Sequence, residues 1–330
     1  MADANTPRDL PSASAEVSEN ATSAFALLSS EGRLAILWTL WQAIEPGQEQ
    51  TPISFTELAE RCPYDSPGNL SYHLDKLVGE YVHKTASGYL LTGTGQKIVG
   101  AIRAGAMTRN VSFGPFEIDE PCPYCGGGVE ASYSDNFIEA RCTACGGTYP
   151  ENGPGVLDHH PPGPGGVITH CEFPPAGVDA RDPGESLPTY LTRAAFQAFS
   201  MLADACPECA APVRVTTTLC SDHAGGDRPC ETCGFRYAAQ SVLACRHCKL
   251  QVVAATRWLP LSDPSVAAFF HERGVDASAG FSMELWAAMD DADVFVRSTD
   301  PVDLEIEYRL DGDTLAVGVD GTVSEIDVRG

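Results

Sequence analysis

The sequence predicts an α+β protein with several domains, and three observations lead to this class. Apolar residues recur at helical spacing through roughly the first hundred residues. Further along, Cys-x-x-Cys pairs bracket segments in which apolar and polar residues alternate as they do in strands. Near the end, apolar-rich segments are separated by Asp311-Gly312 and Asp320-Gly321, which are typical turns of antiparallel hairpins.

The composition limits the class of protein further. The chain has 330 residues, 43% of them hydrophobic, and 21 Lys/Arg against 45 Asp/Glu give a formal net charge of -24. Such a chain can bury more than one core, and its acidic, lysine-poor composition indicates a folded protein from a high-salt cytosol. It shows neither a signal-peptide pattern nor an apolar stretch of membrane-spanning length, so we expect a cytoplasmic protein with no membrane partner. Thirteen cysteines in a cytosolic chain indicate metal sites rather than disulfides.

The segment from Ser66 to Leu77 is predicted to be an amphipathic helix. Ser66 is a favourable N-cap, and Pro67 suits the first turn. One stripe of this helix is apolar and is formed by Leu70, Leu74 and Leu77. A second stripe carries side chains that can reach phosphates and base edges, namely Asn69, Tyr72, His73 and Lys76. The alternatives are a recognition helix for the major groove and an ordinary surface helix, and the flanking segments favour the first.

The segments around this helix complete the pattern of a winged helix-turn-helix. Further helices are expected at Ala15–Leu28, Glu31–Trp41, Ser54–Ala59 and Gln96–Ala106. A hairpin is expected from Tyr81–Lys84 and Tyr89–Thr92, with Lys84 at the base of this wing, where it can contact a phosphate. Residues 66–112 carry five Lys/Arg and two Asp/Glu in an otherwise acidic chain, as expected of a phosphate-binding face.

Three motifs in this region resemble those of the ArsR-type winged-helix transcriptional regulators. They are the segments Ala26–Leu37, Phe55–Ala59 and Leu70–Leu77. The resemblance implies that Ser71 and His73 lie on the groove-facing helix and that the first and last helices form a homodimer interface. Metal sensors of this family carry a cysteine-rich motif on the helix before the turn. Only Cys62 is found there in this chain, and we expect it to be a small buried residue.

The candidate DNA-binding residues are therefore Ser66, Asn69, Ser71, Tyr72, His73, Lys76 and Lys84. The chain as a whole resembles helix-turn-helix regulators of halophilic archaea. In those proteins an ArsR-like domain is followed by cysteine-rich modules and an uncharacterised C-terminal domain.

The first set of paired cysteines is predicted to form a zinc ribbon. Its candidate ligands are Cys122, Cys125, Cys142 and Cys145. Between the two pairs, Val129–Ser134 and Asn136–Ala140 alternate as the strands of a hairpin do. Four thiolates complete a tetrahedral site with no open position, so the expected metal is a structural Zn²⁺.

A second cysteine-rich stretch repeats this pattern with additional ligands. Its candidate ligands are Cys206, Cys209, Cys220, His223, Cys230, Cys233, Cys245 and Cys248. An internal duplication favours one zinc on Cys206, Cys209, Cys230 and Cys233 and another on Cys220, His223, Cys245 and Cys248. The sequential alternative joins Cys206/Cys209 to Cys220/His223 and Cys230/Cys233 to Cys245/Cys248. With the first ribbon, three structural zinc ions are expected.

The remaining segments complete the predicted domain organisation. The expected domains are a disordered acidic terminus (1–15), the winged helix (16–112), a zinc ribbon (113–150), a Pro/Gly linker (151–185), a helix with the second zinc module (186–260) and a C-terminal α+β domain (261–330). Cys171 falls in the linker and is not expected to bind a metal. One face of the Leu187–Ala205 helix is expected to carry Phe196 with other apolar residues. In the last domain, helices at Pro264–Arg273 and Ser282–Met289 should pack on an antiparallel sheet.

These patterns together predict a DNA-binding transcriptional regulator. The winged helix is expected to read the major groove of double-stranded DNA as a homodimer, and the C-terminal half to sense a signal or contact a partner. The alternatives are a factor that binds a protein of the transcription machinery and a redox- or metal-responsive sensor. An enzyme is not expected, because the sequence has no phosphate loop, no nucleophile elbow and no zinc set with an open position beside a carboxylate base.

Overall fold

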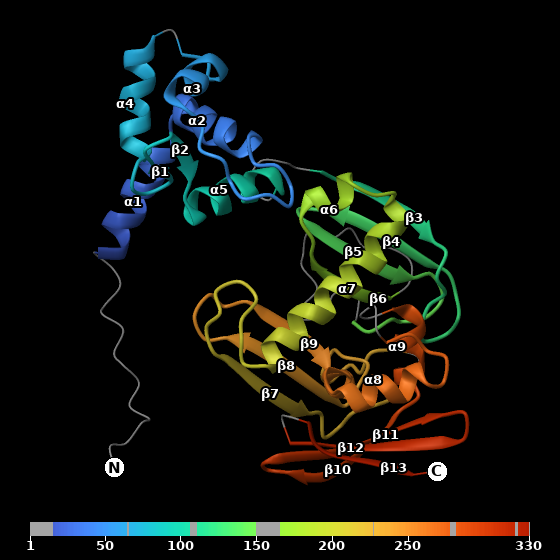
Figure 1. Cartoon of the computed structure of the whole chain (residues 1–330). Coiled ribbons are helices and arrows are strands. Elements are labelled where there is room, and N and C mark those ends of the chain that lie inside the picture. Colours follow the sequence, from blue (N-terminus) through green and yellow to red (C-terminus); the bar gives the residue numbers. More distant parts are fainter. Residues whose placement is uncertain are drawn as a thin grey trace, which may run out of the picture. The chain divides into compact units, whose positions relative to one another are not determined.

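The structure is a computed structural model that describes residues 16–64, 66–105, 111–149, 166–226, 228–277, 282–320 and 323–329. The predicted disordered terminus, residues 1–15, lies outside this range. The chain divides into two compact units, residues 1–108 and 109–330, which are described one at a time. Helices and several antiparallel sheets make up the described residues (Figure 1), so the predicted α+β multidomain class is confirmed.

The first unit contains helices and a hairpin in the order that the sequence predicts. Its helices are α1 (Glu16–Leu28), α2 (Glu31–Gln42), α3 (Phe55–Arg61), α4 (Pro67–Leu77) and α5 (Gly93–Arg103). Its paired strands are β1 (Val82–Lys84) and β2 (Tyr89–Leu91). Helix α5 begins three residues earlier than predicted because Thr92 caps it, with its hydroxyl accepting a hydrogen bond from the Gly95 N–H at 3.0 Å.

The core of the first unit forms where α4 packs against α2. The predicted apolar stripe of α4 is buried, namely Leu70, Leu74 and Leu77. These side chains share a core with Ile36 and Leu37 of α2, and burying each leucine contributes roughly 1.5–3 kcal/mol. Cys62 lies in the same core, with its Sγ 3.4 Å from the Thr39 hydroxyl oxygen, and burial raises the pKa of its thiol. Cys62 is therefore buried, as predicted.

The hairpin of the first unit is short and closed by its own polar turn. Val82 lies opposite Leu91, and Lys84 lies opposite Tyr89. The Thr85 N–H donates to the Gly88 carbonyl oxygen at 2.7 Å and closes the turn. On the other side of β2, Ile53 bridges to Tyr89, which anchors the hairpin to the segment before α3.

Replacing a core leucine of α4 tests this packing. Leu74→Ala should lower the free energy of unfolding of the first unit by about 3 kcal/mol, because it leaves a cavity beneath α4. Asp75→Ala, at the neighbouring exposed position, is the matched control and should have little effect. Hydrogen exchange measured by mass spectrometry reports on each unit separately. Unchanged protection of α2 and α4 in Leu74→Ala would contradict this packing.

The second unit is built from three antiparallel sheets and the helices between them. The first sheet contains β3 (Phe113–Ile118), β4 (Val129–Ser134), β5 (Phe137–Cys142) and β6 (Val167–Glu172). The second contains β7 (Val213–Leu219), β8 (Ala239–Cys245) and β9 (Gln251–Ala255). The third contains β10 (Asp293–Thr299), β11 (Val302–Leu310), β12 (Asp313–Val319) and β13 (Val323–Arg329). The helices are α6 (Pro175–Asp179), α7 (Pro183–Leu202), the 3₁₀ helix η1 (Thr256–Ser262), α8 (Pro264–His271) and α9 (Met283–Asp290).

The predicted linker at 151–185 is wrong from residue 166 onwards. Strand β6 pairs antiparallel with β5, with Ile138 opposite Cys171, and Val167 and Ile168 are fully buried. Helices α6 and α7 follow directly. The surrounding Pro/Gly-rich composition conceals a strand whose apolar residues occupy only its first positions. Residues 150–165 lie outside the described part of the chain.

One continuous packing arrangement joins the segments that the sequence analysis divides at residues 185 and 260. Tyr190 and Leu191 of α7 pack with Ile138 of the first sheet, and Trp286 of α9 belongs to the same core. Helix α7 runs from the first sheet to the second (Figure 1). The predicted boundaries are therefore wrong, because these elements form one compact unit. Phe196 of α7 is 59% exposed, and its ring centre lies 6.4 Å from that of Phe199 on the same helix.

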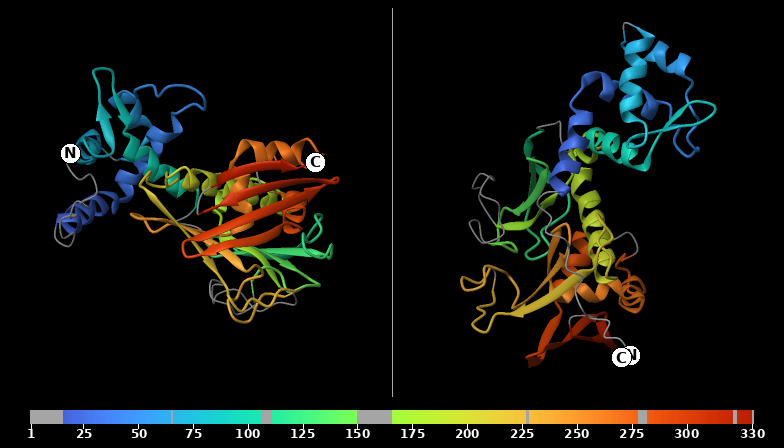
Figure 2. Two further views of the ribbon diagram at one scale, coloured as in Figure 1. Left: turned by 90° about the horizontal axis from the view of Figure 1, so that it is seen from below. Right: turned by 90° about the vertical axis from the view of Figure 1, so that its left-hand side faces the viewer.

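The C-terminal sheet agrees with its prediction. Its strands follow one another in the order β10-β11-β12-β13, and Figure 2 shows them side by side. Phe270 of α8 and Met289 of α9 pack against Ile306 and Val317 on one face of this sheet. The turn at Asp311-Gly312 has positive φ angles of 53° and 91°. No helix in the described ranges combines the length and hydrophobicity needed to cross a membrane.

Candidate metal centres and candidate nucleic-acid interface

All twelve predicted metal ligands fall into three groups of four. The groups are Cys122/Cys125/Cys142/Cys145, Cys206/Cys209/Cys245/Cys248 and Cys220/His223/Cys230/Cys233. Within each group the four ligand atoms lie within 4.8 Å of one another, so each group can hold a metal ion. Cys62 and Cys171, among the described residues, belong to no such group. Cys171 is held in β6, and burial raises the pKa of its thiol.

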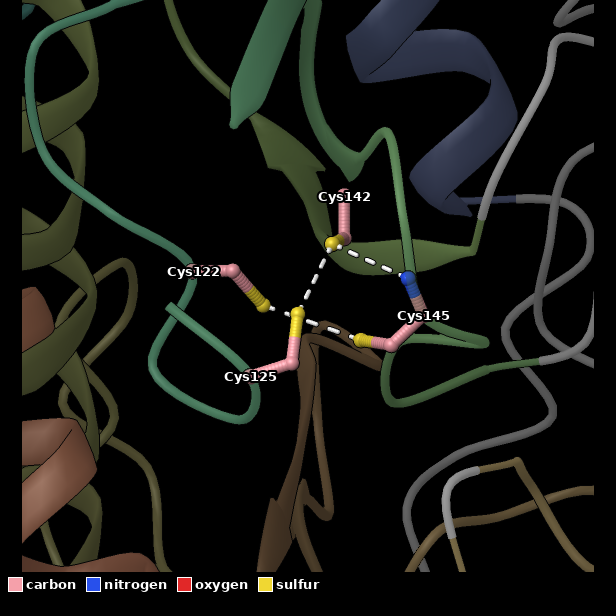
Figure 3. Close-up of side chains that lie close together, drawn as sticks. All are labelled: Cys122, Cys125, Cys142 and Cys145. Carbon is pink, nitrogen blue, oxygen red and sulfur yellow. Dashed lines mark hydrogen bonds between the residues drawn. The ribbon is translucent and has the colours of Figure 1, made fainter. Parts of the chain in front are cut away.

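The first group sits at one end of the β4–β5 hairpin (Figure 3). Cys122 and Cys125 precede β4, Cys142 ends β5, and Cys145 follows it. The Sγ atoms of Cys122 and Cys145 are 3.7 Å apart, and those of Cys125 and Cys142 are 3.5 Å apart. A tetrahedron with metal–sulfur bonds of about 2.3 Å has edges of about 3.8 Å, so the four sulfurs fit a closed four-coordinate site.

The second group corrects both pairings that the sequence analysis considers. Cys206 and Cys209 join Cys245 and Cys248, with Sγ distances of 3.5 Å for Cys206–Cys248 and for Cys209–Cys245. The strand register explains this choice. Val213 lies opposite Cys245 just as Val129 lies opposite Cys142, and each valine follows the first cysteine of its group by seven positions.

The predicted duplication is therefore present in the strand register, but the closing pair of its second copy is Cys245/Cys248. Both pairings considered from the sequence also begin with Cys206 and Cys209, so the seven-residue offset alone does not select Cys245/Cys248, and the strand register does.

The third group is an insertion between the two strands of the second ribbon. Cys220, His223, Cys230 and Cys233 all lie between the end of β7 and the start of β8. His223 Nδ1 is 3.6 Å from the Cys233 Sγ, while Nε2 is 3.1 Å from the Arg236 carbonyl oxygen. Because a carbonyl oxygen only accepts, Nε2 carries the proton and the Nδ1 lone pair is left for a metal.

The first cysteine pair of the first two groups and the second pair of the third group lie in turns closed by two backbone hydrogen bonds. At Cys122 the Gly126 N–H donates to the Cys122 carbonyl oxygen at 2.9 Å, and the Cys122 N–H donates to the Gly127 carbonyl oxygen at 2.8 Å. Cys206 and Cys230 make the same pair of hydrogen bonds. The residue four positions after the first cysteine has a positive φ in these turns, which are centred on Gly126 (70°), Ala210 (57°) and Gly234 (64°).

One thiol in each group is favoured as a thiolate. Burial opposes ionisation of Cys142, but the N–H groups of Cys145 and Ala144 and neighbouring thiols lower its pKa to about 7. In the second group burial also opposes ionisation, yet the N–H groups of His247 and Cys248 help to lower the pKa of Cys245 to about 6. In the third, the Ala224 N–H contributes most to a Cys230 pKa of about 6. Thiolates are the form that binds metals, so each group already favours one ionised ligand.

Metal content of paired substitutions tests the grouping. The wild-type chain should hold three ions, one for each group. Cys209→Ser/Cys248→Ser should lose one ion, because both residues serve the same centre, whereas Cys209→Ser/Cys233→Ser should lose two. Elemental analysis after dialysis against a chelator measures the difference. Equal losses in the two double variants would contradict the grouping.

Helix α4 presents three of the four residues of its second stripe to solvent. The Ser66 hydroxyl accepts a hydrogen bond from the Asn69 N–H at 3.3 Å, so Ser66 is an N-cap as predicted. Asn69, Tyr72 and Lys76 are exposed, Tyr72 by 58%. The Lys76 Nζ lies 5.7 Å from the centre of the Tyr72 ring, a cation–π distance.

Other candidate DNA-binding residues are less uniform in their exposure. His73 is partly buried between Tyr64 and Tyr72, with ring-centre distances of 5.4 and 5.2 Å, and its Nδ1 is covered. Ser71 is also partly buried. Lys84 is exposed on β1, with its Nζ 5.7 Å from the centre of the Tyr89 ring. Asn69, Tyr72 and Lys76 are thus the most accessible part of the predicted face.

Comparison with protein families divides the chain in the same way as its packing. Residues 119–324 match a family described as a domain of unknown function (DUF7351). This match covers more than half of the chain, so the protein belongs to that family. Residues 21–102 match a second domain of unknown function (DUF7347). No curated protein and no solved structure matches the chain.

Proposed function

We propose that this protein is a DNA-binding transcriptional regulator whose first unit is a winged helix-turn-helix. Helix α4 enters the major groove, and the β1–β2 hairpin acts as a wing that brings Lys84 to a phosphate. The observation that carries this proposal is the division of α4 into two stripes. Its leucines are buried, while Asn69, Tyr72 and Lys76 project away from the core.

The charge distribution supports the same surface. Residues 66–112 carry a net charge of +3, from five Lys/Arg and two Asp/Glu, within a chain of net charge -24. The acidic remainder repels the phosphate backbone, which directs DNA towards the first unit. In high salt, phosphate contacts lose strength, so the base-edge contacts of Asn69 and Tyr72 become more important for affinity.

Zinc is the metal that fits the three centres best in this proposal. Two groups offer four cysteines each, and the third offers three cysteines and a histidine, which are typical structural zinc donors. Each set supplies all four positions of a tetrahedron, so a bound zinc ion would be structural. The four ligands of each group would hold the zinc ion, and the bound ion would in turn stabilise the folded module around them.

Substitutions on α4 test DNA recognition in the full chain. Tyr72→Ala and Asn69→Ala should each reduce discrimination between cognate and random duplexes by about 1–3 kcal/mol, because base-edge contacts are lost. Lys76→Ala should weaken binding to every sequence, and the slope of log affinity against log salt concentration should fall by about one. Arg181→Ala, which removes an exposed arginine of the second unit, is the control.

Selection of binding sites from genomic fragments, followed by titration in KCl, measures these effects. If the wild-type chain enriches no sequence, or if Tyr72→Ala enriches the same sequence equally well, α4 is not the recognition helix.

Dimerisation is part of the proposed function, and α1 carries the apolar side chain best placed for it. Phe25 on α1 is 70% exposed, and aromatic side chains are enriched at protein–protein interfaces. Phe25→Ser should therefore convert a dimer into a monomer. Phe196→Ser, which removes a phenylalanine that is 59% exposed on α7, is the control. Light scattering on a sizing column gives the mass, and a monomeric wild-type chain would rule out this interface.

A further inference from the structure

The second ribbon differs in charge from the rest of its unit. Residues 113–330 contain 13 Lys/Arg and 33 Asp/Glu, but residues 206–255 contain five of these bases and only four of these acids. This module, from the first ligand to the end of β9, is therefore nearly neutral within a strongly acidic region. Three of its five bases, Arg214, Arg246 and Lys249, lie on β7 or in the turn after β8.

The outer face of the β7–β8–β9 sheet has no acidic residue. Strand alternation turns one set of side chains outward, namely Arg214, Thr216, Thr218, Gln240, Val242, Ala244, Gln251 and Val253. The residues between them, such as Leu243 and Ala254, are buried in the module's core. Register aligns Arg214 with Ala244 and Gln251, and Thr216 with Val242 and Val253, so the eight side chains share one face.

Further bases lie at the end of this face. After β8 the chain turns through Arg246, His247 and Lys249, all of which are exposed. The Arg246 N–H donates to the Pro212 carbonyl oxygen at 3.1 Å, which extends the β7–β8 ladder by one position. Alternation then places Arg246 on the same side as Arg214. We call the eight outward residues together with Arg246 and Lys249 the basic sheet face.

We propose that the basic sheet face binds the phosphodiester backbone of duplex DNA. Arginine and lysine attract phosphates, and threonine hydroxyls and glutamine amides can donate hydrogen bonds to phosphate oxygens. The face has no aromatic side chain on which an unpaired base can stack, so it suits a duplex rather than a single strand. The contact is independent of sequence and lies in the second unit, beyond the contact proposed for α4.

A different role for the same bases is to neutralise the metal centre. Four thiolates on a divalent ion leave a charge of -2, and Arg246 and Lys249 lie in the turn that carries Cys245 and Cys248. This role predicts that removing the bases releases metal. The proposal predicts that the metal stays bound while DNA binding weakens.

Salt dependence of binding in the full chain distinguishes these roles. The starting protein carries Tyr72→Ala/Lys76→Ala, which removes the proposed α4 contact, and the probe is a fluorescent duplex of random sequence. Adding Arg246→Gln/Lys249→Gln should lower the slope of log affinity against log [KCl] by about 1.8, because two phosphate contacts are lost. The matched control, Arg181→Gln/Arg193→Gln, removes two exposed arginines elsewhere in the unit and should leave the slope unchanged.

A second pair of variants leaves the cationic turn intact. Thr216→Glu puts a negative charge in the middle of the face and should weaken duplex binding, whereas Thr299→Glu, at an exposed position on β10, should not. All variants should retain three metal ions. The proposal would be overturned if Arg246→Gln/Lys249→Gln and Arg181→Gln/Arg193→Gln gave equal slopes. Loss of one metal ion from Arg246→Gln/Lys249→Gln would also overturn it, as would dissociation of a dimer without a change in DNA binding. Because α4 is already altered, this outcome does not depend on sequence recognition by the first unit.

Discussion

The pairing of Val213 with Cys245 across β7 and β8 is the constraint on which the second ribbon depends. It brings the cysteine turn before β7 to the cysteine turn after β8, as the pairing of Val129 with Cys142 does in the first ribbon. The register therefore joins Cys206/Cys209 to Cys245/Cys248. The other four ligands of this module lie in the connection between β7 and β8. The same register also decides which side chains face outward.

The small size of these sheets explains why such closure matters. The core of the second ribbon contains Val213, Leu243 and Ala254, and it includes the ligands Cys206 and Cys245 among its buried residues. A core of this size stabilises a three-stranded sheet only modestly, and a bound metal would supply the missing stabilisation. Metal binding and folding of this module are therefore expected to be coupled. In the first unit, by contrast, a core built around α2 and α4 has no metal-binding group among the described residues.

Local signals in the sequence predict local structure well. Ser66 caps α4, the leucines of α4 are buried, and Asp311-Gly312 forms the turn between β11 and β12. These features depend on residues that are neighbours in the chain. The ligand pairing depends on register between distant segments, which Cys-x-x-Cys spacing alone does not determine. Strand β6 was missed because its pairing partner, not its own composition, makes it a strand. His73 has helical spacing appropriate for an exposed face, but Tyr64 from the preceding turn covers part of it.

The proposed contacts with DNA lie where this acidic chain has few acids, on α4 with its wing and on the outer face of the second ribbon. The central claim is that the chain recognises particular DNA sequences through α4. Mapping the genome-wide occupancy of the tagged protein tests this claim most directly. The account predicts discrete peaks near promoters that share a sequence and that disappear in the Tyr72→Ala variant. Occupancy that merely follows the transcription machinery, with no shared sequence and no dependence on Tyr72, would contradict it.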